Sequence, residues 1–130
     1  MSSQSESNRS HSSGDAGREH GALEKRLRSR MRELREDVCA GLIAEDEERY
    51  LDLVGNVREW ANEHVAVRLR ELDLRPVHRH LPEIEAIDAA LQRIEAGRYG
   101  LCVECGATMA CDFLAANPTA ARCPDCVVSA

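Results

Sequence analysis

Two pairs of cysteines constrain the fold of this chain more than any other feature of its sequence. Each pair has the spacing C-x-x-C, and the inner cysteines of the two pairs lie eighteen positions apart. This spacing fits a tetrahedral four-thiolate zinc site, in which the intervening segment brings the second knuckle back onto the first. A single ion then closes a subdomain that is too small to bury a core. We therefore expect one structural Zn²⁺, with four ligands: Cys102, Cys105, Cys123 and Cys126.

Two other uses of cysteine, a disulfide framework and a redox motif, fit the sequence less well. Residues 1–21 are polar and contain no apolar stretch for a signal or a membrane span, so we expect a cytoplasmic protein with reduced thiols. A thioredoxin-like motif uses one C-x-x-C near a strand–helix–strand pattern, whereas this chain has two pairs and no convincing strand. Cys39 and Cys111 lack the ligand spacing, and we interpret them as packing residues.

The charge balance argues against a general nucleic-acid binder. The chain has 23 acidic and 17 basic residues, a formal net charge of −6, and such binders present a basic face instead. The segment between the first and last ligand is also acidic, and its charged residues are Glu104, Asp112, Arg122 and Asp125. We expect no sequence-specific DNA binding. We expect no enzymatic activity either, because a closed four-cysteine site leaves zinc no open position for water.

A long apolar stripe begins near residue 21 and is typical of a helix. Its members recur at steps of three or four residues: Leu23, Leu27, Met31, Leu34, Val38 and Leu42. The stripe rotates slightly around an acidic run at 45–48, which we interpret as a solvated face. Its extension consists of Ile43, Tyr50, Val54 and Val57. A continuous helix over residues 23–53 would be about 46 Å long and would need a partner.

A second stripe of similar length supplies that partner. Its members are Val65, Leu69, Leu72, Val77, Leu81, Ile84, Ile87, Leu91 and Ile94. Two such stripes joined by a short polar segment predict an antiparallel helical hairpin, a coiled coil over residues 21–97. We expect its arms near 21–55 and 65–96 and its tip near 55–64.

Single residues refine this hairpin. Leu34 and Leu91 should be buried at the seam between the arms. Pro76 and Pro82 predict an interruption of the second arm, because a proline inside a helix removes a hydrogen bond and clashes with the preceding turn. Pro82 could instead begin a new helical segment. Gly97 is expected to end the arm in the left-handed conformation that glycine favours there.

The fold class that follows is mainly α, with a small C-terminal four-cysteine zinc finger over residues 98–130. Residues 1–20 are rich in serine and lack a periodic apolar face, so we expect a disordered polar tail there. His11 and His20 lie in or beside this tail and are expected to be solvated.

Several segments of this sequence resemble the DksA/TraR family of bacterial transcription regulators. They are GRYGLCVECG, FLAANPTAARC, the closing CPDC, and the preceding IEAIDAALQRIEAG. The resemblance is specific over residues 84–126 and looser back to about residue 51. It implies a protein that binds RNA polymerase by placing a coiled-coil hairpin in the secondary channel, where acidic residues at the tip approach the catalytic magnesium. Some members act together with the alarmone ppGpp.

The expected tip departs from the family pattern, which is D-x-x-D-x-A or a variant with serine last. The best register places Glu59, Asn62 and His64 on those three positions, so only one carboxylate is kept. Glu63 could replace Asn62 if the turn shifts by one residue. Trp60, the only tryptophan, could anchor a partner surface or cap the end of the hairpin. We take these four residues as the candidate partner-binding site.

Two classes of function are therefore open. The first is a zinc-binding regulator that modulates transcription initiation through RNA polymerase, with an output altered by the degenerate tip. The second is a zinc-stapled helical adaptor that binds another protein, or that occupies the channel as a competitor. Co-purification with RNA polymerase would separate the regulator from an adaptor for another protein.

Overall fold

The chain is built almost entirely of helices in the computed structural model, which describes residues 2–60 and 64–129, with residues 2–19 and 128–129 described by their backbone alone. The helices are α1 (Ser2–Glu59), α2 (His64–Glu71), α3 (Arg75–His78), α4 (Leu81–Glu95), α5 (Cys111–Ala116) and α6 (Pro124–Ser129). Strand pairing in the described residues is limited to an isolated antiparallel bridge between Leu101 and Thr108. The mainly α fold class is confirmed. No helix in the described part of the chain is both long and apolar enough for a membrane span.

The chain divides into two compact units. One unit consists of Arg28–Ala89, and the other of Met1–Leu27 together with Ala90–Ala130. The first unit is a cluster of helices, and the second contains the four-cysteine segment. α1 and α4 each contribute residues to both units.

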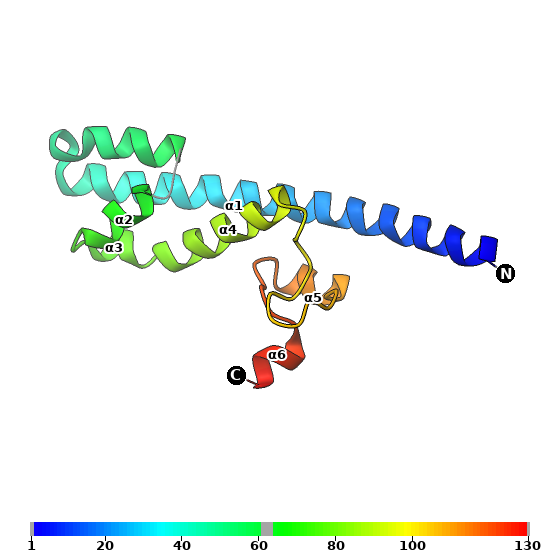
Figure 1. Cartoon of the computed structure of the whole chain (residues 1–130). Coiled ribbons are helices and arrows are strands. Elements are labelled where there is room, and N and C mark those ends of the chain that lie inside the picture. Colours follow the sequence, from blue (N-terminus) through cyan, green and yellow to red (C-terminus); the bar gives the residue numbers. More distant parts are fainter. Residues whose placement is uncertain (1, 61–63, 130) are drawn as a thin grey trace. The chain divides into compact units, whose positions relative to one another are not determined.

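The most consequential feature of the first unit is a reversal inside α1 (Figure 1). Asp46 has an extended backbone (φ −164°, ψ 94°) and separates two helical segments. The segments then run antiparallel, because the Cys39 thiol donates to the Val54 carbonyl at 3.6 Å. One turn further along the pair, the Arg58 guanidinium contacts the Glu36 carboxylate at 3.1 Å. The hairpin turn of this unit therefore lies at Asp46.

Local chemistry explains why the helix restarts at this point. The Asp46 carboxylate accepts a hydrogen bond from the backbone N–H of Arg49 at 3.0 Å, which is the contact that an N-cap residue makes. Glu47 and Glu48 follow in the first turn, where the positive end of the helix dipole favours carboxylates. The acidic run that we interpreted as a solvated face is thus also the start of a helix.

This reversal corrects the predicted position of the tip near 55–64. Glu59 ends the returning segment beside the middle of the first arm, since Arg35 donates to the carbonyl of Arg58 at 3.2 Å. A segment of 47–59 at the ordinary helical rise brings Glu59 back by about 20 Å from the turn. The pattern of stripes could not show this, because a rotated stripe has the same period whether the helix continues or folds back.

The tail also differs from the expectation. α1 begins at Ser2, so the backbone is helical through residues 2–20, where we expected disorder. Adding residues to an existing helix costs little, so a polar composition alone does not end one. We expected His20 to be solvated. Its ring instead packs edge-on against Tyr99, with the ring centroids 5.0 Å apart.

The core of the helical unit comes from both predicted stripes. Its most deeply buried stripe members are Met31, Leu34, Val38, Leu42, Val57, Leu69, Val77, Ile84 and Ile87, each at most 2% exposed. Such a side chain contributes about 1.5–3 kcal/mol by leaving water. Leu91, which we expected to be buried in the same way as Leu34, is only half-buried.

The interruption expected at the prolines is present. α3 ends at His78 and α4 starts at Leu81, which places Pro82 in the first turn, where its missing N–H does no harm. At the other end of α4, Gly97 has φ +70° and donates to the carbonyl of Ile94 at 3.1 Å. The backbone N–H of Arg98 donates to the carbonyl of Arg93 at 2.8 Å, which completes a Schellman cap. The predicted role of Gly97 is confirmed.

We expect Leu34→Ala to destabilise the helical unit by about 2–4 kcal/mol, because it leaves a cavity at a fully buried position. Leu51→Ala is the matched control, since Leu51 is 64% exposed and its truncation should change stability by less than about 0.5 kcal/mol. Urea unfolding followed by circular dichroism measures both. Equal effects of the two substitutions would refute this core.

We expect Asp46→Ala to destabilise the same unit by about 1 kcal/mol, because the N-cap contact is lost. Asp46→Asn keeps an acceptor at that position and should recover most of the difference. Thermal melting of the two variants tests the reversal directly. A helix that ran straight through residue 46 would be stabilised by alanine, which has the highest helix propensity.

Candidate metal centre

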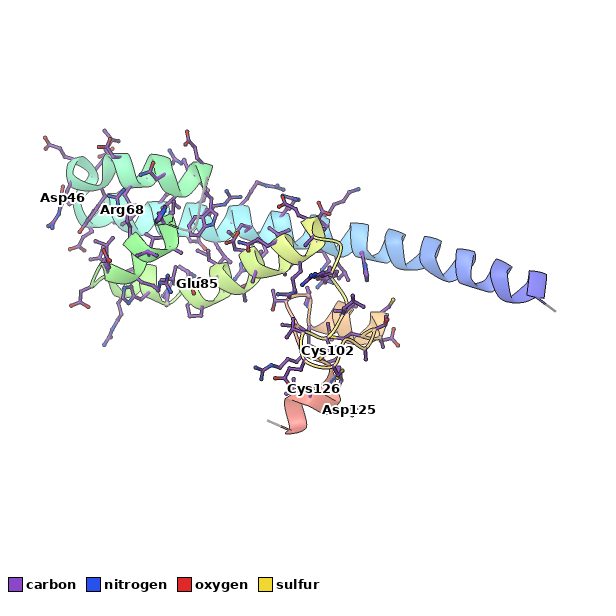
Figure 2. The ribbon with its side chains drawn as sticks, viewed as in Figure 1. Asp46, Arg68, Glu85, Cys102, Asp125 and Cys126 are labelled. Atoms are coloured by element: carbon purple, nitrogen blue, oxygen red, sulfur yellow. The ribbon has the colours of Figure 1, made fainter. Side chains whose placement is uncertain are left out.

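The first cysteine pair lies in a tight turn that backbone hydrogen bonds close. The N–H of Cys102 donates to the carbonyl of Ala107, and the N–H of Gly106 donates back to the carbonyl of Cys102, each at 2.9 Å. Gly106 has φ +75°, which a residue with a side chain adopts only at a cost. The turn carries buried Cys102, which is labelled in Figure 2, and exposed Cys105.

The second pair lies at the start of α6. Cys123 precedes Pro124, and proline suits the first helical position because its missing N–H would have no partner there. The N–H of Val127 donates to the carbonyl of Cys123 at 3.0 Å. Cys126 therefore follows Cys123 by one helical turn, which places both side chains on the same face.

These two turns bring four sulfur atoms together. All four lie within 4.8 Å of one another, and the Sγ atoms of Cys105 and Cys123 are 3.7 Å apart. Thiolates bound tetrahedrally to zinc at about 2.3 Å would be separated by about 3.8 Å. The cluster fits one metal ion, and the residues that would hold it are Cys102, Cys105, Cys123 and Cys126. Cys111 is not part of this cluster.

The electrostatics of the cluster favour a cation. Backbone hydrogen bonds from Cys105 and Cys123 lower the pKa of Cys102 to about 6, so this sulfur readily carries negative charge. Hydrogen bonds with the side chains of Cys123, Cys102 and Cys105 raise the pKa of Cys126, and the negative charge on Cys102 raises it further. A divalent cation removes this conflict, since it stabilises all four thiolates at once.

A loop between the two pairs is held from outside the cluster. The Tyr99 hydroxyl donates to the carbonyl of Pro118 at 2.8 Å. The Arg93 guanidinium donates to the carbonyls of Thr119 and Ala120 at 3.2 and 3.3 Å. The sequence contained a signal for Tyr99 in the segment GRYGLC, whereas nothing in the helical pattern of α4 distinguished Arg93 from a surface arginine.

Among the described residues of the candidate tip, Glu59 and His64 do not belong to a cluster of possible metal ligands. Glu59 is exposed at the end of α1, and His64 is exposed at the first position of α2. Trp60 is half-buried with φ +45°. Its backbone N–H donates to the carbonyl of Asn56 at 2.8 Å, which caps the end of the helix. The indole Nε1 is buried without a hydrogen-bond partner. Asn62 lies outside the described residues.

Comparison with known proteins gives one structural relative with this architecture. The chain is similar to the solution structure of DnaK suppressor protein from Agrobacterium tumefaciens, at 29% sequence identity and a TM-score of 0.52. The similarity covers 85% of this chain and 92% of that one. No family model and no curated protein sequence matches the chain.

The fold and the cluster define a helical protein with a small C-terminal module that four cysteines organise. Within that class, the chain is similar to a DnaK suppressor protein. This similarity supports the resemblance to the DksA/TraR family that the cysteine segments indicated, and it extends to most of the chain.

We expect the purified protein to bind one equivalent of a divalent metal ion. Cys102→Ser should weaken that binding by more than roughly 100-fold, because even groups that only orient metal ligands are worth 10–100-fold. Cys111→Ser is the matched control in the same segment and should bind normally. Competition with a chromophoric chelator measures both affinities. Equal affinity of the two variants would show that the cluster is not the metal site.

Proposed function

We propose that this protein is a zinc-binding transcription regulator that binds RNA polymerase through its secondary channel and modulates initiation. The observation that carries the proposal is the combination, in one chain, of a DksA-like fold and a four-sulfur cluster, matched over 85% of the chain by a DnaK suppressor protein. RNA polymerase as the partner comes from the resemblance to the DksA/TraR family. The protein would act in the cytoplasm, where that partner is found.

Zinc is the metal that suits this donor set. Four thiolates in a tetrahedron select zinc over the harder cations, which prefer oxygen ligands. When bound, zinc supplies structural free energy of about 10–16 kcal/mol, as measured for zinc-finger peptides, and no catalytic chemistry. Cys102, Cys105, Cys123 and Cys126 would complete its coordination, so no position is left for substrate or water.

The reversal at Asp46 changes which residues the proposal assigns to the far end of the hairpin. Glu45, Glu47 and Glu48 are exposed there, and none of them has an ion-pair partner in the described part of the chain. Asp46 is engaged as a cap. In this proposal the carboxylates at the reversal act near the catalytic magnesium, because charge acts most strongly over short and poorly screened distances.

One observation favours the second function, that of an adaptor or channel competitor. At the tip positions of the family pattern, this chain has only one carboxylate, Glu59. Glu59 lies beside the first arm rather than at the turn. A protein with this arrangement would occupy a channel without reproducing the family's effect. Binding and effect on initiation must therefore be measured separately.

We expect the protein to compete with a labelled channel-binding protein for purified RNA polymerase and to alter initiation on a promoter with a short-lived open complex. The combined substitution Glu45→Gln, Glu47→Gln and Glu48→Gln should leave polymerase affinity within about threefold and reduce the effect on initiation, because it removes three charges without truncating side chains. Parallel reactions with and without ppGpp test the co-regulator.

Glu59→Gln is the matched control and should change the effect less than the triple substitution does. If Glu59→Gln abolishes the effect on initiation and the triple substitution does not, the functional tip is the one that the family pattern places at Glu59. If the native protein binds polymerase without altering initiation, it is a competitor. Failure to bind polymerase at all would leave the adaptor function.

A further inference from the structure

The loop 117–121 connects the two halves of the cysteine cluster. The carbonyl of Ala121 in this loop accepts a hydrogen bond from the N–H of Val103 at 2.8 Å. Val103 directly follows the ligand Cys102, and only Arg122 separates Ala121 from the ligand Cys123. The position of the loop therefore sets where the second cysteine pair lies relative to the first.

Two side chains from outside this loop donate hydrogen bonds to three consecutive carbonyls in it. The Tyr99 hydroxyl donates to the carbonyl of Pro118 at 2.8 Å. The Nη2 atom of Arg93, in the last turn of α4, donates to the carbonyls of Thr119 and Ala120 at 3.2 and 3.3 Å. Neither side chain supplies a metal ligand, so both reach the second cysteine pair through the loop.

Partial burial makes these two contacts stronger than a hydrogen bond at the surface. Tyr99 is 7% exposed, and burial raises the pKa of its hydroxyl. Burial lowers the pKa of Arg93, because desolvation disfavours the charged form. Water competes less for donors in such surroundings. Arg26 also donates to this segment, at the Ala115 carbonyl and 3.2 Å away, but from an exposed position where the contribution is smaller.

The conformation of Arg93 has an unfavourable component. Its Nε is buried and has no hydrogen-bond partner among the described residues. A buried donor without a partner costs free energy, and an arginine that only covered the surface would turn this nitrogen toward water. The side chain instead directs Nη2 at two loop carbonyls, so the arrangement favours the loop over the arginine itself.

We propose that Arg93 and Tyr99 are positioning residues for the metal site, and that they raise its metal affinity by ordering the loop 117–121 before the metal binds. A flexible loop would have to be ordered by the metal ion itself, and the free energy spent on ordering would be lost from binding. Linkage requires the reverse effect as well, so a bound metal ion strengthens the hold of both side chains on the loop. The inference rests on the proposed metal site and is independent of RNA polymerase.

The test measures the Zn²⁺ affinity of the full-length protein by competition with a chromophoric chelator. Arg93→Met keeps most of the side-chain stem and removes the guanidinium, whereas Tyr99→Phe removes only the hydroxyl. Each substitution should weaken Zn²⁺ binding by roughly tenfold, the lower end of what groups that orient metal ligands contribute. Because Tyr99→Phe retains the buried ring, it keeps the test valid if Arg93→Met fails to fold.

The double variant separates positioning of one shared loop from two unrelated effects. Arg93 and Tyr99 hold neighbouring carbonyls, so removing either contact already frees part of the same loop. The second substitution should therefore weaken Zn²⁺ binding by less than roughly tenfold more. A loss equal to the product of the two single effects would show that the residues act independently, which would contradict positioning through one loop.

Two substitutions serve as matched controls. Arg98→Met removes the same charge from an exposed side chain near the cluster, and Tyr50→Phe removes the same hydroxyl in the helical unit. Neither should change the Zn²⁺ affinity by more than about twofold. Urea unfolding of the helical unit, followed by circular dichroism, should be unchanged in Arg93→Met and Tyr99→Phe. A shift in that unfolding with unchanged Zn²⁺ affinity would mean that both residues serve stability alone and would overturn the proposal.

The native protein separates this inference from the proposed metal site. If the native protein binds Zn²⁺ and the Arg93→Met and Tyr99→Phe proteins bind it equally well, the positioning role is wrong and the metal site stands. If the native protein binds no Zn²⁺, the metal site is wrong and the positioning role is wrong with it.

Discussion

Repulsion among four thiolates, and its relief by a cation, is the constraint on which the C-terminal part of this protein depends. The sulfur atoms lie within 4.8 Å of one another, so they cannot all be ionised without a positive charge between them. The surrounding helices are short, since α5 and α6 have six residues each, and isolated helices of that length are not stable in water. A bound metal ion would therefore supply the stability that a hydrophobic core supplies in the helical unit.

The helical unit depends on a different constraint, the burial of a stripe that is too long to remain unpaired. The chain satisfies it by folding back at Asp46, so that Val57 from the returning segment and Leu34 from the first arm are both fully buried. α3 approaches the first arm closely enough that a side chain at Gly41 would contact Pro76 at 3.4 Å. The result is a cluster of helices in place of a two-helix rod, which places the exposed carboxylates at the reversal.

The residues assigned to transcription regulation and those assigned to metal binding lie in different parts of the chain. The reversal carries the charges assigned to the regulator function, whereas the metal cluster belongs to the cysteine segment. Tyr99 and Arg93 hold the loop that lies between the cysteine pairs, so residues outside the cluster also fix its surroundings.

The sequence by itself determined the features that depend on residue spacing and local conformation. The two C-x-x-C pairs predicted the cysteine cluster, Gly97 predicted the end of α4, and Pro82 predicted the start of a new segment, because each of these acts within a few residues. The fold class followed from the 3.6-residue period. The tertiary structure alone decided where the hairpin turns, because a stripe that rotates past Glu47 has the same period in a straight helix and in one that reverses. It also decided that His20 packs on Tyr99 and that Arg93 holds the loop, since both contacts join residues far apart in the sequence.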